Sequence, residues 1–245
     1  MKSENQIYGL HAIIEAINTD RPINKVYLQK RLQGDLFKKL ETLIRKKGVV
    51  SSYVPIEKLN KLTKNNHQGA VALISPIAFS PFEEVAEHIL KTKDLPFFLL
   101  LDRLSDVRNF GAIIRTAVCC GVDAIVVPKT GSAPINDDTV KTSAGAAFNI
   151  PIAKVDHLKD AVFYLQSSGI EIIAATEKTE NSIYDVSFNK PCAVIMGSEG
   201  KGISPSLLKL ADHSAKLPML GDIESLNVSV ACGVFLYEVV RQRMD

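Results

Sequence analysis

The sequence predicts an α/β protein in two parts: a small amino-terminal α/β domain and a larger domain built on a mostly parallel sheet. Short, almost continuously apolar segments recur in the larger part, and we expect strands at 97–102, 124–127, 171–175 and 192–196. Helical patterns accompany them at 109–120, 157–168, 204–211 and 226–243. Apolar strands that take turns with helices are typical of a parallel sheet that is covered on both faces.

The first part of the chain has the same alternation in shorter elements. Helices are expected near 9–18 and 34–47, and strands near 25–29, 49–54 and 70–74. Two Ser-Pro pairs then interrupt the pattern, and Ser80 to Glu83 has the order of a capping box, with proline at the first helical position. We therefore predict a first domain over 1–75, a linker with a connecting helix over 76–92, and a second domain over 93–245.

The composition of the 245 residues is that of a globular protein, with 46% hydrophobic and 23% charged residues. No apolar run reaches the roughly 18 residues of a membrane-spanning helix, and the amino terminus lacks the segment order of a signal peptide. The four cysteines form no C-x-x-C pair, and the five histidines are scattered. These features predict a cytoplasmic protein with no metal site and no membrane partner, whose cysteines are small buried residues.

Charge is divided unevenly along the chain. Residues 1–75 hold 13 Lys and Arg against 6 Asp and Glu, whereas the remainder holds 16 against 21. Seven basic residues are concentrated in one short region: Lys30, Arg31, Lys38, Lys39, Arg45, Lys46 and Lys47. A solvated helix face explains such a run as readily as a surface for a phosphate backbone. The charge asymmetry favours the phosphate surface, whose binding weakens steeply with salt.

A polar loop and the start of a helix follow the strand at 97–102. Asn109 is the expected N-cap of this helix. Arg115 lies almost two turns further along a helix that is otherwise rich in small and apolar residues. An arginine there either reaches solvent or has a partner. The partner is an internal acidic group or a bound phosphate, which a guanidinium grips with two hydrogen bonds.

A glycine-rich loop, M-G-S-E-G-K-G at 196–202, lies between a strand and a helix. Three glycines allow positive φ angles and a close approach of the backbone to a ligand. The spacing matches neither a P-loop nor the dinucleotide motif, so the loop indicates neither ATP nor NAD. Glu199 stands near a helix N-terminus, where it either compensates the helix dipole or serves a ligand.

A third loop, L-P-M-L-G-D-I-E-S-L-N-V-S-V-A at 217–231, leads into the last helix. Ser225 is the expected cap of that helix, and Asn227 is expected in its first turn. Taken alone, this segment indicates no more than routine capping.

In this order, N-x-G-x-x-x-R-T-A, M-G-S-E-G-x-G and L-P-M-x-G-x-x-x-S-L-N-V-S-V-A resemble the three signature motifs of the SpoU-type RNA ribose 2′-O-methyltransferases. The resemblance covers about 97–243 closely. YGLHAIIEAI and HQGAVALI are similar to the small RNA-binding domain of the same family. The chain departs from the pattern at Val107, because many relatives carry a proline between the residues that correspond to Asp106 and Asn109.

The resemblance implies an enzyme that transfers methyl from S-adenosylmethionine to the ribose 2′-hydroxyl of a guanosine in 23S rRNA, with a tRNA as the alternative substrate. It implies a SPOUT fold with a deep trefoil knot over about 192–230, an L30e-like RNA-binding domain, and a homodimer with composite active sites. A non-catalytic ribosome-assembly factor is a further alternative. The retained Asn109, Arg115, Glu199 and Asn227 argue against it.

The resemblance also implies roles for particular residues. The expected catalytic residues are Asn109, Arg115, Glu199, Ser225 and Asn227. The expected cofactor-binding residues are Thr176, Gly197, Leu217, Met219 and Leu226. Relatives are often described with the arginine as general base, although a guanidinium resists deprotonation and is better suited to binding phosphate. The last helix, with Val230, Val234 and Val240, is the candidate for part of the dimer contact, and packing on its own sheet is the alternative.

Overall fold

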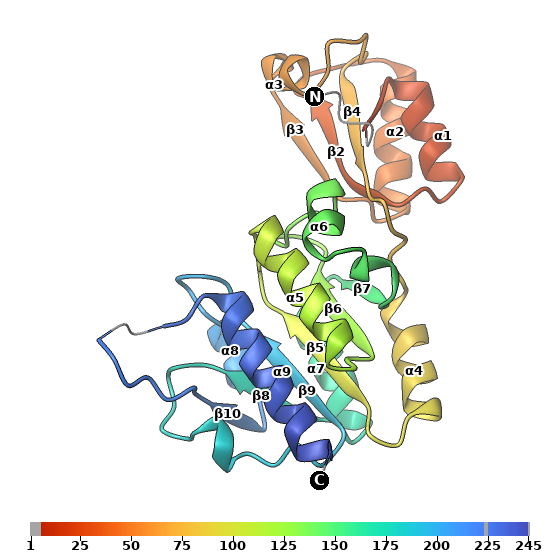
Figure 1. Ribbon diagram of the computed structural model, residues 1–245. Helices are drawn as coiled ribbons and strands as arrows, with labels where there is room; N and C mark the ends of the chain where they lie inside the picture. The colour runs from red at the N-terminus through yellow and green to blue at the C-terminus, as the bar shows by residue number, and fades with distance from the viewer. Residues whose placement is uncertain (1–5, 223–224, 245) are drawn as a thin grey trace. The chain divides into compact units, whose positions relative to one another are not determined.

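The computed structural model describes residues 6–222 and 225–244, and these form two compact units (Figure 1). One unit extends to Ala78 and includes Pro134–Asp137; the other contains Phe79–Ala133 and the chain from Asp138 onward. Helix α4 (Phe82–Thr92) belongs to the second unit and begins without a side-chain cap, so the predicted Ser80 capping box is wrong. The predicted domain limits at 75 and 92 stay predictions.

The first unit is a four-stranded mixed sheet with strand order β1-β4-β2-β3. β1 and β2 run antiparallel to β4, and β3 runs parallel to β2. α1 and α2 pack on one face of the sheet, and α3 packs against β2 and β4. The five predicted elements are confirmed to within two residues, whereas β1 and α3 had not been predicted. The bounds are β1 (Gln6–Tyr8), α1 (Leu10–Asn18), β2 (Ile23–Gln29), α2 (Asp35–Lys46), β3 (Ser51–Val54), α3 (Ile56–Leu62) and β4 (Ala70–Ile74).

The second unit confirms the predicted parallel sheet. It has six strands in the order β10-β8-β9-β5-β6-β7, and every neighbouring pair is parallel. The strands are β5 (Phe97–Leu101), β6 (Ala124–Pro128), β7 (Ile152–Val155), β8 (Glu171–Ala175), β9 (Cys192–Met196) and β10 (His213–Ala215). The further helices are α5 (Val107–Cys119), α6 (Asp137–Thr142), α7 (Leu158–Ser167), α8 (Pro205–Leu208) and α9 (Val228–Met244), with the 3₁₀ turns η1 (Ala146–Phe148) and η2 (Ile183–Asp185).

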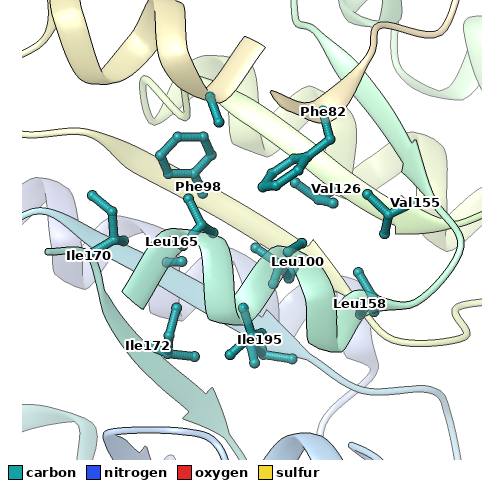
Figure 2. Packing of buried hydrophobic residues seen from close by; sticks show 14 of the residues in the cluster. Phe82, Phe98, Leu100, Val126, Val155, Leu158, Leu165, Ile170, Ile172 and Ile195 are labelled. Atoms are coloured by element: carbon teal, nitrogen blue, oxygen red, sulfur yellow. The ribbon is translucent and has the colours of Figure 1, made fainter. Parts of the chain in front are cut away.

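Both faces of this sheet are buried. Figure 2 shows one face, where Phe98 of β5 and Ile195 of β9 pack with Leu165 of α7. The alternate residues Leu99 and Val194 are buried as well, on the face where α9 packs against α5 (Figure 1). Because side chains alternate across a strand, a strand that is covered on both faces has to be apolar at every position.

The carboxyl ends of β8, β9 and β5 lie side by side at one edge of the sheet. Parallel strands end at the same edge, and ligands of open α/β sheets bind beyond it. The loops that leave this edge carry the motif residues of the second unit. The knot expected over about 192–230 includes residues 223–224, which lie outside the described residues.

Three of the four cysteines are buried as predicted, but Cys119 at the end of α5 is exposed. Burial raises the pKa of the Cys120 and Cys192 thiols to about 11, which keeps them protonated and unreactive. Within the described residues, no group of three His, Cys, Asp or Glu side chains is placed to hold a metal ion. No described helix is both long and apolar enough to cross a membrane.

Candidate active site

The start of α5 differs from the prediction in a way that matters for the site. Asp106 is the cap, and its carboxylate accepts hydrogen bonds from the backbone N–H groups of Arg108 and Asn109 at 2.9 and 2.8 Å. The predicted capping role of Asn109 is therefore wrong, and its side chain is free for other contacts. Val107, at the position of the relatives' proline, is the first helical residue. Proline is tolerated at that position, so the departure leaves the start of the helix unchanged.

The Asn109 side chain joins two distant segments. Its Nδ2 donates a hydrogen bond to Oε1 of Glu199 in the glycine-rich loop. Its Oδ1 accepts a hydrogen bond from Nδ2 of Asn227 at 3.2 Å. An amide can donate and accept at the same time, so one side chain connects three segments that are 90 and 118 residues apart in the chain.

Asn227 caps the last helix. Its Oδ1 accepts hydrogen bonds from the backbone N–H and the hydroxyl of Ser229, at 2.9 and 2.6 Å, and α9 begins at Val228. The prediction that Ser225 is this cap is wrong. Ser225 lies ahead of the helix, where it lines the cavity described below.

The glycine-rich loop is folded tightly on itself after β9. Ser198 and Gly202 exchange two backbone hydrogen bonds, with N–O distances of 3.1 and 2.8 Å. A Cβ atom on Gly197 would lie 2.1 Å from the carbonyl carbon of Gly202 and 2.2 Å from the nitrogen of Ile203. Only glycine fits at position 197 without moving backbone, and this contact closes the loop at its base.

A cavity of about 590 Å³ lies where the loops meet. Eight of the ten predicted catalytic and cofactor-binding residues line it: Thr176, Gly197, Glu199, Leu217, Met219, Ser225, Leu226 and Asn227. Helix α9 adds Val228, Ala231 and Phe235, which had not been predicted. The volume is within the range of about 300–1,000 Å³ that is usual for small-molecule sites.

Two family descriptions match the chain. Residues 96–237 match the SpoU rRNA methylase family, and residues 6–80 match a domain described as RNA 2′-O ribose methyltransferase substrate binding. The chain belongs to the SpoU rRNA methylase family. Its activity class is therefore RNA 2′-O ribose methylation, and its first unit corresponds to a substrate-binding domain.

Relatives support this SpoU assignment over the whole chain. YacO of Bacillus subtilis (strain 168), which is named for the TrmH family of tRNA/rRNA methyltransferases, is 32% identical over 99% of this chain and 97% of its own. The AdoMet-bound rRNA methyltransferase from Sinorhizobium meliloti has the same fold, with 24% identity, a TM-score of 0.62, and coverage of 96% of this chain and 86% of that one. The A. aeolicus TrmH/SpoU tRNA modifying enzyme is 29% identical, with a TM-score of 0.57, over 66% of this chain and 82% of that one.

Arg115 of this SpoU methylase lies apart from the cavity of its own chain. It is six residues beyond Asn109, which places the two side chains roughly 120° apart around the helix axis. Its side chain is exposed and lies outside the cavity lining, and within residues 6–222 and 225–244 it has no hydrogen bond or ion pair. The internal ion pair considered for it is therefore absent from that part of the chain.

The seven predicted RNA-binding residues all lie in the first unit and are exposed. Four are on α2, where Lys38 and Arg45, and likewise Lys39 and Lys46, are seven residues apart and share a helix face. Lys47 forms an ion pair with Asp20 at 2.9 Å. The structure gathers these residues on one helix and its flanking loops, while their role toward RNA stays a prediction.

Several residues of the SpoU site had not been predicted from the sequence. Glu177 and Lys216 line the cavity, and Lys216 forms an ion pair with Glu180 at 2.9 Å. Asp102 is buried directly behind the glycine-rich loop. A signal for Asp102 was present, since it is the first charged residue after the five apolar residues of β5. No local pattern marks the other two.

Proposed function

We propose that this enzyme transfers the methyl group of S-adenosylmethionine to the ribose 2′-hydroxyl of a guanosine in 23S rRNA. The observation that carries the proposal is the hydrogen-bonded chain from Asn227 through Asn109 to Glu199 at the edge of a ligand-sized cavity. The choice of guanosine and 23S rRNA rests on the resemblance of the whole-chain layout to the 23S rRNA guanosine 2′-O-methyltransferase RlmB.

The cavity suits S-adenosylmethionine in size and in chemistry. Leu217, Leu226 and Phe235 form an apolar wall for an adenine ring, and Thr176 offers a polar side chain nearby. Gly197 leaves a stretch of backbone without a side chain, where a ligand can approach closely. The AdoMet-bound relative with the same fold supports this choice of cofactor.

The cofactor, when bound, supplies a methyl group on a positively charged sulfur, which is already a strong electrophile. The protein's residues therefore need to align the ribose 2′-oxygen and to receive its proton as the new carbon–oxygen bond forms. Glu177 and Glu199 both line the cavity, and Glu199 is the one whose carboxylate Asn109 holds by a hydrogen bond. We assign proton acceptance to Glu199, and binding of the target phosphate to the Arg115 guanidinium.

The exposed position of Arg115 supports a homodimer in which it serves the partner's cavity. Helix α9 offers a contact face, because Val230, Val234 and Tyr237 are 52%, 37% and 55% exposed and lie at i, i+4 and i+7. The third predicted contact residue, Val240, is half-buried and so less accessible than Val230 and Val234, and the exposed apolar stripe continues through Tyr237 instead. A two-fold dimer would carry two equivalent sites, each with residues from both chains.

A subunit-mixing experiment tests this arrangement. Arg115→Ala and Glu199→Gln should each abolish methyl transfer while binding of S-adenosylhomocysteine is kept. Unfolded and refolded together, the two inactive variants should regain about a quarter of the wild-type rate, because half of the dimers are mixed and each of these holds one complete site. No recovery in verified mixed dimers would show that Arg115 acts within its own chain.

The extent of structural coverage supports rRNA over tRNA. The S. meliloti rRNA methyltransferase covers both units, whereas the A. aeolicus tRNA enzyme covers two thirds of the chain. Mapping of 2′-O-methylated riboses in total RNA from cells with and without this gene tests the substrate. Loss of a single guanosine methylation in 23S rRNA is expected, and loss in a tRNA instead would refute the proposed substrate.

The first unit should contribute affinity for the RNA backbone through α2. We expect Lys38→Gln with Arg45→Gln to make the negative slope of log affinity against log salt shallower by about 1.4 to 1.8, since each lost phosphate contact accounts for about 0.7 in a single strand and about 0.9 in a duplex. Lys159→Gln with Lys209→Gln, two exposed lysines of the second unit, is the matched control. Equal slopes for the two double variants would move the RNA surface away from α2.

A further inference from the structure

Asp102 holds both ends of the glycine-rich loop. It follows β5 directly and is only 4% exposed. Its backbone N–H donates a hydrogen bond to the carbonyl of Met196 at 2.8 Å, where the loop begins. Its carboxylate Oδ2 accepts a hydrogen bond from the backbone N–H of Ser204 at 2.7 Å, where the loop ends.

The carboxylate is paired with the guanidinium of Arg103. The guanidinium donates from Nε to Oδ1 at 3.1 Å and reaches Oδ2 with a second nitrogen at 3.4 Å. The backbone of Arg103 has a φ of 58°, in the left-handed region that non-glycine residues rarely occupy. This conformation turns the chain sharply after β5, and the side chain remains against Asp102. A buried carboxylate is stable only when it is paired and hydrogen-bonded in this way.

The loop between these two bonds carries the chemistry of the proposed site. Gly197 provides the backbone wall of the cavity, and Glu199 bonds to Asn109. Within the loop, the Ser198–Gly202 pair and the close contact at Gly197 define its shape. Neither of these contacts connects the end of the loop to the sheet. Ile203 packs into the apolar core beside the sheet, and the hydrogen bond from the Ser204 N–H to Asp102 is the polar connection of this end to β5.

We propose that Asp102 is a positioning residue for methyl transfer: it anchors the closing end of loop 197–203 to strand β5, and so places Gly197 against the cofactor and Glu199 against Asn109. This inference rests on the proposed function for its effect on catalysis. Asp102 itself lies outside the cavity lining and touches none of the reacting groups. Its effect has to pass through the loop, which predicts changes in both the loop's dynamics and cofactor use.

Amide hydrogen exchange and steady-state kinetics on the full-length enzyme test the proposal together. In Asp102→Ala, exchange in the peptide covering 197–208 should accelerate by about tenfold to a hundredfold, which corresponds to the loss of a hydrogen bond to a charged group. The KM for S-adenosylmethionine should also rise by about tenfold to a hundredfold. Asp102→Asn keeps an oxygen acceptor for Ser204 and should recover a large part of both losses.

Glu238→Ala is the matched control. Glu238 is also a buried carboxylate, 6% exposed, with Arg241 and Gln242 as partners on α9, and it lies outside the cavity. This variant should lose stability yet keep wild-type exchange in 197–208 and a wild-type KM. The proposal is overturned if Asp102→Ala leaves loop exchange unchanged, or if Glu238→Ala changes exchange and KM by as much. If the wild-type protein transfers no methyl group to RNA, the proposed function is refuted. Amide hydrogen exchange in 197–208 of Asp102→Ala would still test whether Asp102 anchors the loop.

Discussion

Replacing Gly197 by alanine is the sharpest test of the candidate site. The added Cβ would lie 2.1 and 2.2 Å from backbone atoms of Gly202 and Ile203. Favourable contacts between carbon atoms lie at about 3.5–4.0 Å, so the two sides of the loop have to separate by roughly 1.4 Å. Both atoms belong to the backbone, so no side-chain rotation relieves the clash.

The cost follows from what this separation breaks. The two backbone hydrogen bonds between Ser198 and Gly202 span 3.1 and 2.8 Å and cannot survive a further 1.4 Å of separation. Each contributes about 1 kcal/mol net, and residual overpacking costs about 1 to 3 kcal/mol. If this cost of about 3 to 5 kcal/mol falls on the ligand-binding conformation of the loop, affinity for S-adenosylhomocysteine falls by roughly 150- to 4,000-fold.

Isothermal titration calorimetry with S-adenosylhomocysteine measures this effect, and Gly233→Ala is its control. Gly233 lies within α9, and a Cβ there would meet only Thr116 Cγ2, at an ordinary 3.7 Å. This control should bind the ligand as the wild type does and gain up to about 1 kcal/mol of stability from helix propensity. Wild-type affinity in Gly197→Ala would show that the loop does not form the wall of the ligand cavity.

Three further predictions concern helix caps and a half-buried lysine. Asp106→Ala should lower the free energy of unfolding by about 1 kcal/mol in denaturant titration, because α5 loses its cap; an unchanged midpoint would contradict this. Asn227→Ser keeps a capping oxygen but loses the bond to Asn109, so it should be as stable as the wild type and have a lower turnover rate. Asn227→Ala should lower both stability and the turnover rate. Equal turnover of Asn227→Ser and wild type would argue against the link to Asn109. Burial lowers the pKa of Lys154 from 10.5 to about 8, so the unfolded chain binds more protons between these values and stability should rise with pH from about 8 to 10. Lys154→Met should remove that rise in calorimetric melting curves and should melt higher than the wild type at pH 7.

The central strands could be predicted because their physical requirement is local. β5 and β9 are covered on both faces and are apolar at every position, and β8 is apolar after Glu171, so each run is visible in the sequence. The edge strands lack this signal. β10 consists of three residues and begins with an exposed histidine, and β7 carries Lys154. Their pairing depends on a neighbouring strand from elsewhere in the chain, which no short sequence window contains.

The helix caps show where local reasoning stops. Asp106 and Asn109 are both good capping residues, three positions apart, and so are Ser225 and Asn227, two positions apart. Propensity alone could not choose between the members of each pair. The choice depends on partners 90 and 118 residues away, since Asn109 is held by Glu199 and Asn227. The convergence of the three loops was likewise expected only from the resemblance to a family, because strand order in a sheet is not encoded locally.

The hydrogen bonds from Ser229 to Glu199 all run from donor to acceptor in the same direction along the chain of side chains, and this explains why two asparagines stand between them. The Ser229 N–H donates to Asn227 Oδ1, Asn227 Nδ2 donates to Asn109 Oδ1, and Asn109 Nδ2 donates to Glu199. Each asparagine must accept a hydrogen bond at its oxygen and donate one from its nitrogen. An ionised aspartate has no donor, and a serine hydroxyl, which can do both, is on a shorter side chain. Bonds aligned in one sense strengthen one another and deliver a donor to the Glu199 carboxylate. Asn109→Asp would therefore place two carboxylates against each other and remove the donor, so it should impair turnover more than Asn109→Ala does, although it is the smaller change in shape.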